Sequence, residues 1–434
     1  MENTTMSQRG RTAKQAGIAL SATDTQTRNN ALAKIAEALD ARRTEIVAAN
    51  SRDYARSVDE KLAAPLLKRL TFDDHKIDDV IDGIKSLIAL KDPLGETRLA
   101  TELDEGLDLY KVTCPIGVIG IIFESRPDAF VQISTLCLKS GNAVLLKGGR
   151  EALETNRILC EIISQATEAA GIPAGWIQNL ESRDDVSAML ALDEYIDLII
   201  PRGSNSFVKY IIDNSNIPVM GHSDGICHVY VDQAADIDMA VKIAVDAKTQ
   251  YVAACNTAET LLVHRAVADA FLPALRAALA QKNVQLKGDA SVCGIIDIQP
   301  ATAEDWQTEY LDYILSIKMV DSLDEAIDHI NTYGSGHTDV IVTADEAAAK
   351  RFTTLVDSAG VFWNCSSRFS DGFRFGFGAE VGISTSKLHA RGPVGLDGLL
   401  SYKYKLIGHG NIVADYAEGK KSFTHQPLDR DCPL

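Results

Sequence analysis

Residues 251–264, YVAACNTAETLLVH, place a single cysteine, Cys255, between an expected helix and an expected strand. Upstream, apolar residues recur at helical spacing over 237–245, and Asp236 is the expected N-cap. Downstream, residues 260–263 form a short apolar run that fits a buried strand. Cys255 therefore lies at a junction between elements, where function is most often carried.

The chemistry of this stretch depends on the thiol of Cys255. A thiolate is the strongest side-chain nucleophile near neutral pH, and it forms thioesters with activated acyl groups. The backbone N–H of Cys255 and the neighbouring amide of Asn256 can hold a developing oxyanion. The alternative is that Cys255 is a small buried hydrophobe, the usual role of an isolated cysteine. The stretch alone does not decide between the two.

Three further blocks of sequence carry a family resemblance: PIGVIGIIFESRPD at 115–128, GHSDGICHVYVD at 221–232 and FGFGAEVGISTSKLHARGP at 375–393. Together with the cysteine stretch, they resemble the γ-glutamyl phosphate reductases, or glutamate-5-semialdehyde dehydrogenases, of the aldehyde dehydrogenase superfamily. The resemblance extends from the first helices to near the C-terminus. Four long blocks in the right order make chance agreement improbable.

Length and composition limit the class of protein. A chain of 434 residues is too long for one core, so two or three domains are expected. The net charge of −17 and pI near 5.0 argue against nucleic acid or an anionic membrane as partner. No apolar run is long enough to span a bilayer, and the N-terminus lacks a secretory signal.

The eight cysteines are scattered and contain no Cys-x-x-Cys pair, and no histidines stand at ligand spacing. Reduced thiols in a cytoplasmic enzyme are therefore expected, with neither a disulfide framework nor a bound metal.

Hydrophobic periodicity predicts the order of the elements. Residues 7–90 form helices, and 97–113 alternate like a hairpin with a turn near 105–106. From 116, short apolar runs alternate with helical segments, which predicts a mostly parallel sheet covered by helices. The resemblance implies an aldehyde dehydrogenase-like α/β fold: a Rossmann-type cofactor domain, an α/β catalytic domain and a β oligomerisation arm.

The expected domain bounds follow this pattern. They are 1–232 for the cofactor-binding domain with the pairing arm at 97–113, then 233–399 for the catalytic domain, and 400–434 for a C-terminal returning segment. An ordinary surface hairpin is the alternative for 97–113.

A G-x-G-x-x-G fingerprint is absent, so motif alone predicts no dinucleotide site. Instead, two strands run into the glycine turns 147–150 and 201–204, which lead into helices whose N-terminal amides can take an anion. Tight turns without a ligand are the alternative.

The resemblance gives these turns roles in binding the cofactor. It implies that Lys147 binds the adenine ribose, that Gly203 and Ser204 approach the pyrophosphate, and that Glu309 binds the nicotinamide ribose. Members that use NAD often carry a glutamate where this chain has Arg150. A guanidinium there suits a 2′-phosphate, which favours NADP(H).

The general-base glutamate of hydrolytic aldehyde dehydrogenases is replaced by Gly221. A thioester on Cys255 is therefore expected to react with something other than water, and acyl phosphate chemistry fits. The resemblance implies NADPH-dependent reduction of L-glutamyl 5-phosphate to L-glutamate 5-semialdehyde, the second step of proline biosynthesis. A strong base is unnecessary if the thiol is already ionised, and His222 or Asp224 either assists or is a loop residue.

A doubly anionic substrate in an acidic protein needs local cations. Lys387, His389 and Arg391 alternate so as to face one side if the chain is extended. The full set of substrate-binding candidates is Arg126, His222, His337, Lys387, His389 and Arg391. The expected assembly is a homo-oligomer, and a glutamate 5-kinase is a candidate partner. A related enzyme for another carbon chain and a scaffold without catalysis are the rival hypotheses.

Overall fold

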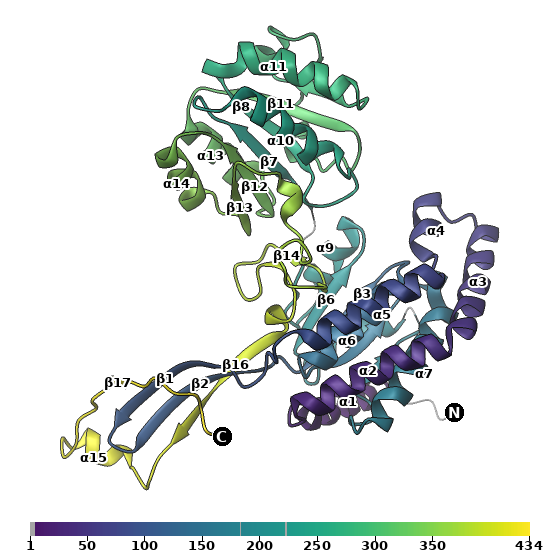
Figure 1. Cartoon of the computed structure of the whole chain (residues 1–434), viewed down its shortest axis with the longest axis vertical. Helices are drawn as coiled ribbons and strands as arrows, with labels where there is room; N and C mark the ends of the chain where they lie inside the picture. Colours follow the sequence, from purple (N-terminus) through teal and green to yellow (C-terminus); the bar gives the residue numbers. More distant parts are fainter. Residues whose placement is uncertain (1–4, 183, 222–223) are drawn as a thin grey trace.

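The computed structural model describes residues 5–182, 184–221 and 224–434. Three larger sheets organise it: a parallel sheet in each of two α/β bodies and an antiparallel sheet in a long arm (Figure 1). One body holds the N-terminal helices, and the other holds helices α10, α11, α13 and α14 (Figure 1). The arm extends away from both bodies (Figure 1).

The N-terminal region is helical, as the periodicity predicts. Asp24 and Asp73 cap two of the helices by accepting hydrogen bonds from backbone amides in the first turn. Leu32, Ile35 and Ile84 are fully or almost fully buried, so these helices pack their apolar faces into the first core. The helices are α1 (Met6–Leu20), α2 (Thr25–Ala41), α3 (Arg43–Asp59), α4 (Ala64–Leu70) and α5 (Asp74–Ala89).

The first parallel sheet has the strand order β5-β4-β3-β6. Every residue of β3 and β4 is buried, as expected for strands covered on both faces. The strands are β3 (Val118–Phe123), β4 (Ala143–Lys147), β5 (Ile177–Asn179) and β6 (Leu198–Arg202). The intervening helical elements are α6 (Pro127–Lys139), η1 (Arg150–Ala152), α7 (Leu153–Ala169), α8 (Asp184–Leu190) and α9 (Asn205–Asn214).

The second parallel sheet has the order β10-β9-β11-β8-β7-β12-β13. Its strands are β7 (Cys227–Val231), β8 (Ala258–His264), β9 (Gln285–Gly288), β10 (Gln299–Pro300), β11 (Ile314–Val320), β12 (Thr338–Val342) and β13 (Gly360–Trp363). Its helical elements are α10 (Ile237–Thr249), α11 (Arg265–Ala280), α12 (Ala290–Cys293), η2 (Glu304–Gln307), α13 (Leu323–Tyr333) and α14 (Glu346–Leu355). Because β7 pairs with β8 and β12, the predicted domain boundary at residue 232 is one strand too late.

The arm joins sequence from both ends of the chain in the order β16-β2-β1-β17. The predicted hairpin is present as β1 (Thr97–Asp104) and β2 (Leu107–Pro115), with Gly106 at positive φ in the turn. The C-terminal segment returns along it as β16 (Leu400–Ile407), α15 (Val413–Ala417) and β17 (Gln426–Pro427). All pairings in this sheet are antiparallel.

The segment before β16 crosses back to the first body. It contains η3 (Ser367–Phe369), β14 (Ile383–Ser384), β15 (Gly392–Pro393) and η4 (Asp397–Leu399). Val381, Val394 and Leu399 are buried in the same core as the N-terminal helices. The last residues of the predicted catalytic domain, 233–399, therefore pack on the cofactor body, which a division by sequence order alone does not anticipate.

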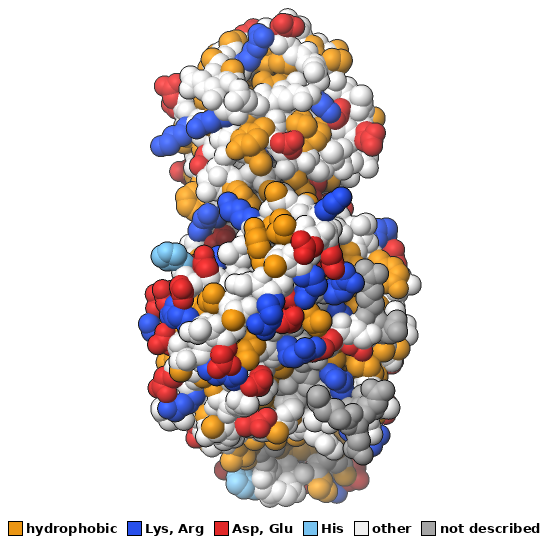
Figure 2. Space-filling model, turned by 90° about the vertical axis from the view of Figure 1, so that its right-hand side faces the viewer, with side chains coloured by type: hydrophobic (Ala, Val, Ile, Leu, Met, Phe, Trp, Pro, Cys, Tyr) orange, Lys and Arg blue, Asp and Glu red, His pale blue; other side chains and the backbone are white. Residues whose placement is uncertain are grey.

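The surface mixes charges of both signs. On the face seen in Figure 2, acidic and basic side chains are interspersed over the lower body. Arg43, for example, forms ion pairs with Asp40, Asp74 and Asp78, and so links α2, α3 and α5. Within the described ranges, no helix combines the length and apolar character that crossing a bilayer requires.

Candidate active site

Cys255 lies in the loop between α10 and β8, where its side chain is partly exposed. The Sγ of Cys227 donates to the carbonyl oxygen of Cys255 at 3.2 Å. Gly225 packs so closely that an added Cβ would lie 2.2 Å from the same oxygen. The backbone of Cys255 is therefore held from two positions.

His337 contacts the sulfur directly. Its Nε2 lies 3.1 Å from the Cys255 Sγ, and its Nδ1 lies 2.8 Å from Thr338 Oγ1. In the tautomer that donates from Nδ1 to Thr338, Nε2 accepts a hydrogen bond from the thiol. The sequence placed His337 among the substrate-binding candidates, and in the structure its buried ring lies beside the nucleophile. This is the geometry of a nucleophile with its general base.

The environment of Cys255 favours the protonated thiol. Burial, the largest cause, and the carboxylates of Glu309 and Glu380 together raise the pKa of Cys255 to about 12, while Arg202 acts in the opposite direction. The condition under which no strong base is needed, a thiol that is already ionised, is therefore not favoured in the free protein. Attack by this sulfur requires a base, and His337 is in hydrogen-bonding distance to supply it.

The side chain of Asn256, which we predicted to hold an oxyanion, forms a hydrogen bond with the protein backbone instead. Its Nδ2 donates to the Ser370 carbonyl at 2.8 Å, and its own carbonyl accepts from Ser367 Oγ at 2.7 Å. The side chain is buried, and Oδ1 has no hydrogen-bond partner among the described residues. In this structure Asn256 anchors the turn after β13 to the cysteine loop.

The predicted cofactor residues lie at the carboxyl ends of β4 and β6, except Glu309, which follows η2. Lys147 is buried, and its Nζ donates to the Gly148 carbonyl at 2.6 Å. Ser204 is the N-cap residue of α9. Asn205 bridges the two bodies, because its Nδ2 lies 2.7 Å from both Glu309 Oε2 and Asp224 Oδ1. Positive groups and helix amides at this edge form a donor set that fits a dinucleotide.

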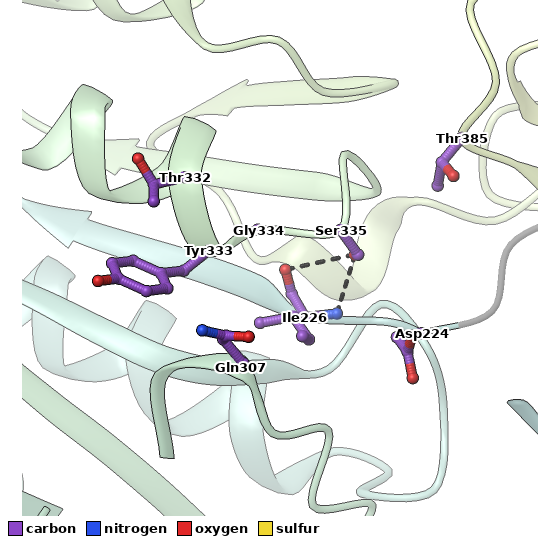
Figure 3. Close-up of a pocket in the computed structure, with 8 residues that line it drawn as sticks. All are labelled: Asp224, Ile226, Gln307, Thr332, Tyr333, Gly334, Ser335 and Thr385. Carbon is purple, nitrogen blue, oxygen red and sulfur yellow. Dashed lines mark hydrogen bonds between the residues drawn. The ribbon is translucent and has the colours of Figure 1, made fainter. Parts of the chain in front are cut away.

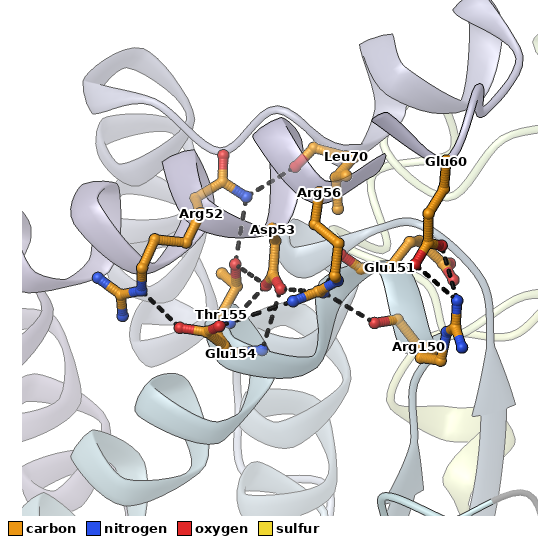
Figure 4. A network of polar contacts seen from close by, with 10 residues as sticks. Arg52, Asp53, Arg56, Glu60, Leu70, Arg150, Glu151, Glu154 and Thr155 are labelled. Atoms are coloured by element: carbon orange, nitrogen blue, oxygen red, sulfur yellow. Dashed lines mark hydrogen bonds and ion pairs between the residues drawn. The ribbon is translucent and has the colours of Figure 1, made fainter. Parts of the chain in front are cut away.

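Arg150 lies at the rim of this edge, where Figure 4 shows it against the end of α3. Its Nη2 is 2.7 Å from each carboxylate oxygen of Glu60, and the side chain is 69% exposed. Arg56 donates to the Arg150 carbonyl at 3.1 Å, which fixes the backbone there. A phosphate at this position would meet an accessible guanidinium already oriented by a carboxylate, so the donor chemistry fits a 2′-phosphate.

Lys387, His389 and Arg391 do not form the predicted array of cations. Lys387 and Arg391 both pair with Asp357, Arg391 at 3.1 Å. They lie on the loop between β14 and β15, which pair antiparallel, so the expected extended array of Lys387, His389 and Arg391 is not formed. His389 is exposed, and His222 lies outside the described residues. Arg126 pairs with Asp128 at 3.1 Å.

Sequence reasoning missed Arg202 and Glu380 as charged groups of the site. Arg202 ends β6, opposite Phe123 of β3, and its charge interacts with those of Cys255, Glu380 and Arg126. Glu380 Oε2 accepts from the Gly372 amide at 2.9 Å. The signal was present, because Arg202 directly precedes the Gly-Ser turn at the carboxyl edge of a parallel sheet, where ligands bind.

A polar cavity of about 330 Å³ lies beside the turn that follows α13 (Figure 3). It is lined by Asp224, Ile226, Gln307, Thr332, Tyr333, Gly334, Ser335 and Thr385. Ser335 Oγ accepts from the Ile226 amide at 2.9 Å, which joins the strand that follows Gly225 to the turn that carries His337. The cavity suits a small polar molecule.

Comparison with known proteins identifies the family. Residues 2–300 match the aldehyde dehydrogenase family. The chain is 66% identical to the gamma-glutamyl phosphate reductase of Acetivibrio thermocellus, over 97% of this chain and 98% of the relative. The chain belongs to the γ-glutamyl phosphate reductase family. It is 64% identical to the Pelotomaculum thermopropionicum member, over 98% of each chain.

Solved structures agree with the family and fold class predicted from the sequence, and both are confirmed. The crystal structure of the Thermotoga maritima γ-glutamyl phosphate reductase superposes with a TM-score of 0.92 at 41% identity, covering 94% of this chain and 99% of that one. An engineered glycolyl-CoA reductase with bound NADP+ shares the fold, with a TM-score of 0.62 at 17% identity over 92% and 96%. The chain is an oxidoreductase of a family that uses NAD(P).

Proposed function

We propose that this chain reduces L-glutamyl 5-phosphate to L-glutamate 5-semialdehyde with NADPH and releases phosphate, the second step of proline biosynthesis from glutamate. The observation that supports it best is the partly exposed Cys255 with His337 Nε2 at 3.1 Å from its sulfur. The 66% identity to a protein named gamma-glutamyl phosphate reductase supports the choice of substrate. The cavity beside Asp224 and Ser335 offers polar groups for its amino-acid end.

The first half-reaction acylates the enzyme. His337 Nε2 takes the thiol proton while the sulfur of Cys255 attacks the C5 carbonyl carbon. The C5–O bond to phosphate breaks, its electron pair leaves with the phosphate, and a thioester remains on Cys255. The imidazolium of His337 holds the proton for the second half.

The second half-reaction frees the aldehyde. Lys147, Arg150, Gly203, Ser204 and Glu309 would hold NADPH, which would supply the hydride that reduces the thioester. The resulting thiohemiacetal collapses with cleavage of the C–S bond, and His337 returns the proton to the departing sulfur of Cys255.

The residue that distinguishes this route from hydrolysis is Gly221. Hydrolytic relatives have a glutamate at this position to activate water, whereas this chain has no side chain there. A Cβ built on Gly221 would lie 3.6 Å from the ring of Pro201. The thioester is thereby left for the hydride or, in reverse, for phosphate.

The test runs the reaction backwards with glutamate semialdehyde, NADP and inorganic phosphate. NADPH formation is expected to require phosphate, and Cys255→Ala is expected to abolish it. Cys160→Ala, on α7, is the matched control and is expected to retain activity. Phosphate-independent oxidation would favour a hydrolytic dehydrogenase instead. Equal rates with shorter semialdehydes would favour an enzyme for a different carbon chain, and activity in Cys255→Ala would favour a scaffold.

The preference for NADPH has its own test. Arg150→Glu is expected to lower the ratio of NADPH to NADH efficiency (kcat/KM) by about 10-fold to 100-fold, because charge-assisted hydrogen bonds to the 2′-phosphate are lost. Arg52→Glu, at an exposed arginine of the neighbouring helix α3, is the control (Figure 4). An unchanged ratio in Arg150→Glu would assign the 2′-phosphate to other residues.

The arm is proposed to assemble a cytoplasmic homo-oligomer. β16 is an edge strand of the arm sheet, and Tyr402, Tyr404 and Leu406 on it are more than half exposed. Unpaired edges with exposed apolar side chains invite pairing with a second chain. Tyr404→Glu is expected to lower the mass measured by sedimentation. A glutamate 5-kinase that delivers the unstable acyl phosphate is the proposed partner.

A further inference from the structure

The proposed reaction brings a doubly charged phosphoryl group next to Cys255. Glu309 and Glu380 already act on this sulfur as negative charges. Without compensating cations, an acyl phosphate would be repelled from the atom that must attack it. A cation close to Cys255 is therefore needed, and Lys387 and Arg391 are held by Asp357 instead.

Arg202 meets this need by its position. It is the last residue of β6, at the carboxyl end of the strand and immediately before the turn that starts α9. Its side chain is partly buried, yet the guanidinium forms no hydrogen bond or ion pair with any residue in the described ranges. A guanidinium that a rigid strand positions, and whose N–H groups have no partner among the described residues, can bind an anionic ligand.

Arg126 lies at the corresponding end of the neighbouring strand. Arg202 is in register with Phe123, the last residue of β3, and Arg126 follows Phe123 by three positions as the N-cap of α6. The two guanidinium charges interact across this edge, with Glu380 and Asp128 as the nearby carboxylates. Two arginines at adjacent strand ends match the planar, multidentate recognition of a phosphate.

We propose that Arg202, with Arg126, binds the phosphoryl group of the acyl phosphate and the inorganic phosphate that it becomes. This assignment rests on the proposed function and names the residues that hold the leaving group. As the sulfur bonds to C5 and the C5–O bond breaks, the negative charge on the phosphate oxygen rises, and the guanidinium of Arg202 stabilises it. The proton stays on His337, so no further reactant is required.

The electrostatics of the free protein agree with this assignment. Burial, the largest cause, and the neighbouring charge of Arg126 together lower the pKa of Arg202 to about 10, while Glu380, Asp128 and Cys255 oppose the shift. At neutral pH Arg202 remains charged. A bound phosphate would relieve the repulsion between the two arginines, which favours binding.

The first test compares Arg202→Gln with the charge-conserving Arg202→Lys in the reverse assay. The KM for inorganic phosphate is expected to rise about 10-fold to 100-fold in Arg202→Gln and less in Arg202→Lys, with the KM for semialdehyde unchanged. Arg351→Gln, in an exposed ion pair on α14, is the control. If Arg202→Gln binds phosphate as the wild type does, the proposal is wrong.

A second readout does not depend on turnover. Inorganic phosphate is expected to slow alkylation of Cys255 by iodoacetamide in the wild type and in Arg202→Lys, but not in Arg202→Gln. Peptide mass spectrometry distinguishes this cysteine from the others. Arg126→Gln gives the same test from a different element if Arg202→Gln does not fold, and protection retained in both variants would overturn the assignment. A wild type that oxidises semialdehyde without phosphate would refute the proposed function itself, whatever the arginine variants do.

Discussion

Replacing His337 with glutamine removes the base from the sulfur and keeps a side chain of similar size. With a pKa of about 12, roughly one thiol in 10⁵ of Cys255 is ionised at pH 7 without assistance. A positioned general base contributes about 10²–10⁴ in rate. We therefore expect the kcat/KM of His337→Gln to fall by about 10²–10⁴. This loss is smaller than the factor of about 10⁵ by which the thiol outnumbers the thiolate at pH 7.

The pH dependence separates a lost base from a distorted site. In His337→Gln, activity should rise about 10-fold for each pH unit through the neutral range, because the thiolate population of Cys255 increases that way below its pKa. The wild type, in which His337 takes the thiol proton, should lack this steep rise. Thr338→Val keeps the base but removes its orienting hydroxyl, so an intermediate loss is expected.

Stopped-flow measurement of the acylation step, with His75→Gln as the exposed control, is the direct assay. A His337→Gln enzyme with near wild-type rates and an unchanged pH profile would refute the role of this imidazole.

Two further predictions concern stability and packing. Lys248 and Glu259 form a fully buried ion pair at 2.5 Å, so Lys248→Met should lower the free energy of unfolding by about 3–5 kcal/mol in urea denaturation, and adding Glu259→Leu should recover part of the loss. Gly225→Ala should reduce kcat sharply, because the added Cβ would overlap the Cys255 carbonyl. Gly83→Ala, on α5, is the control, because its Cβ meets no atom within 4 Å. This variant should retain activity with equal or greater thermal stability.

Elements with local signals could be predicted from the sequence. Asp236 caps α10 by accepting from the Met239 amide at 2.8 Å, and the apolar run after Cys255 is strand β8. Strand β7 was also predicted but assigned to the wrong body. Its apolar pattern identifies a buried strand without saying which sheet it joins, because that depends on pairing with β8 and with β12, far along the chain.

The site was only partly predictable for the same reason. The nucleophilic role of Cys255 followed from its sequence context, but its contact with His337 spans 82 residues and leaves no local pattern. Lys387 and Arg391 carry the charge that the substrate needs, but both form ion pairs with Asp357. Arg202 has no such partner in the described ranges, and only the folded chain distinguishes it from the cations that are already paired.

The return of the C-terminus to the arm has a consequence for biosynthesis. β1 and β2 leave the ribosome early, but their outer edges are covered by β17 and β16, which are translated last. Until then the nascent hairpin presents open hydrogen-bonding edges. The arm sheet is thus completed only after the C-terminal strands have been synthesised, and the proposed contact surface on β16 forms no earlier.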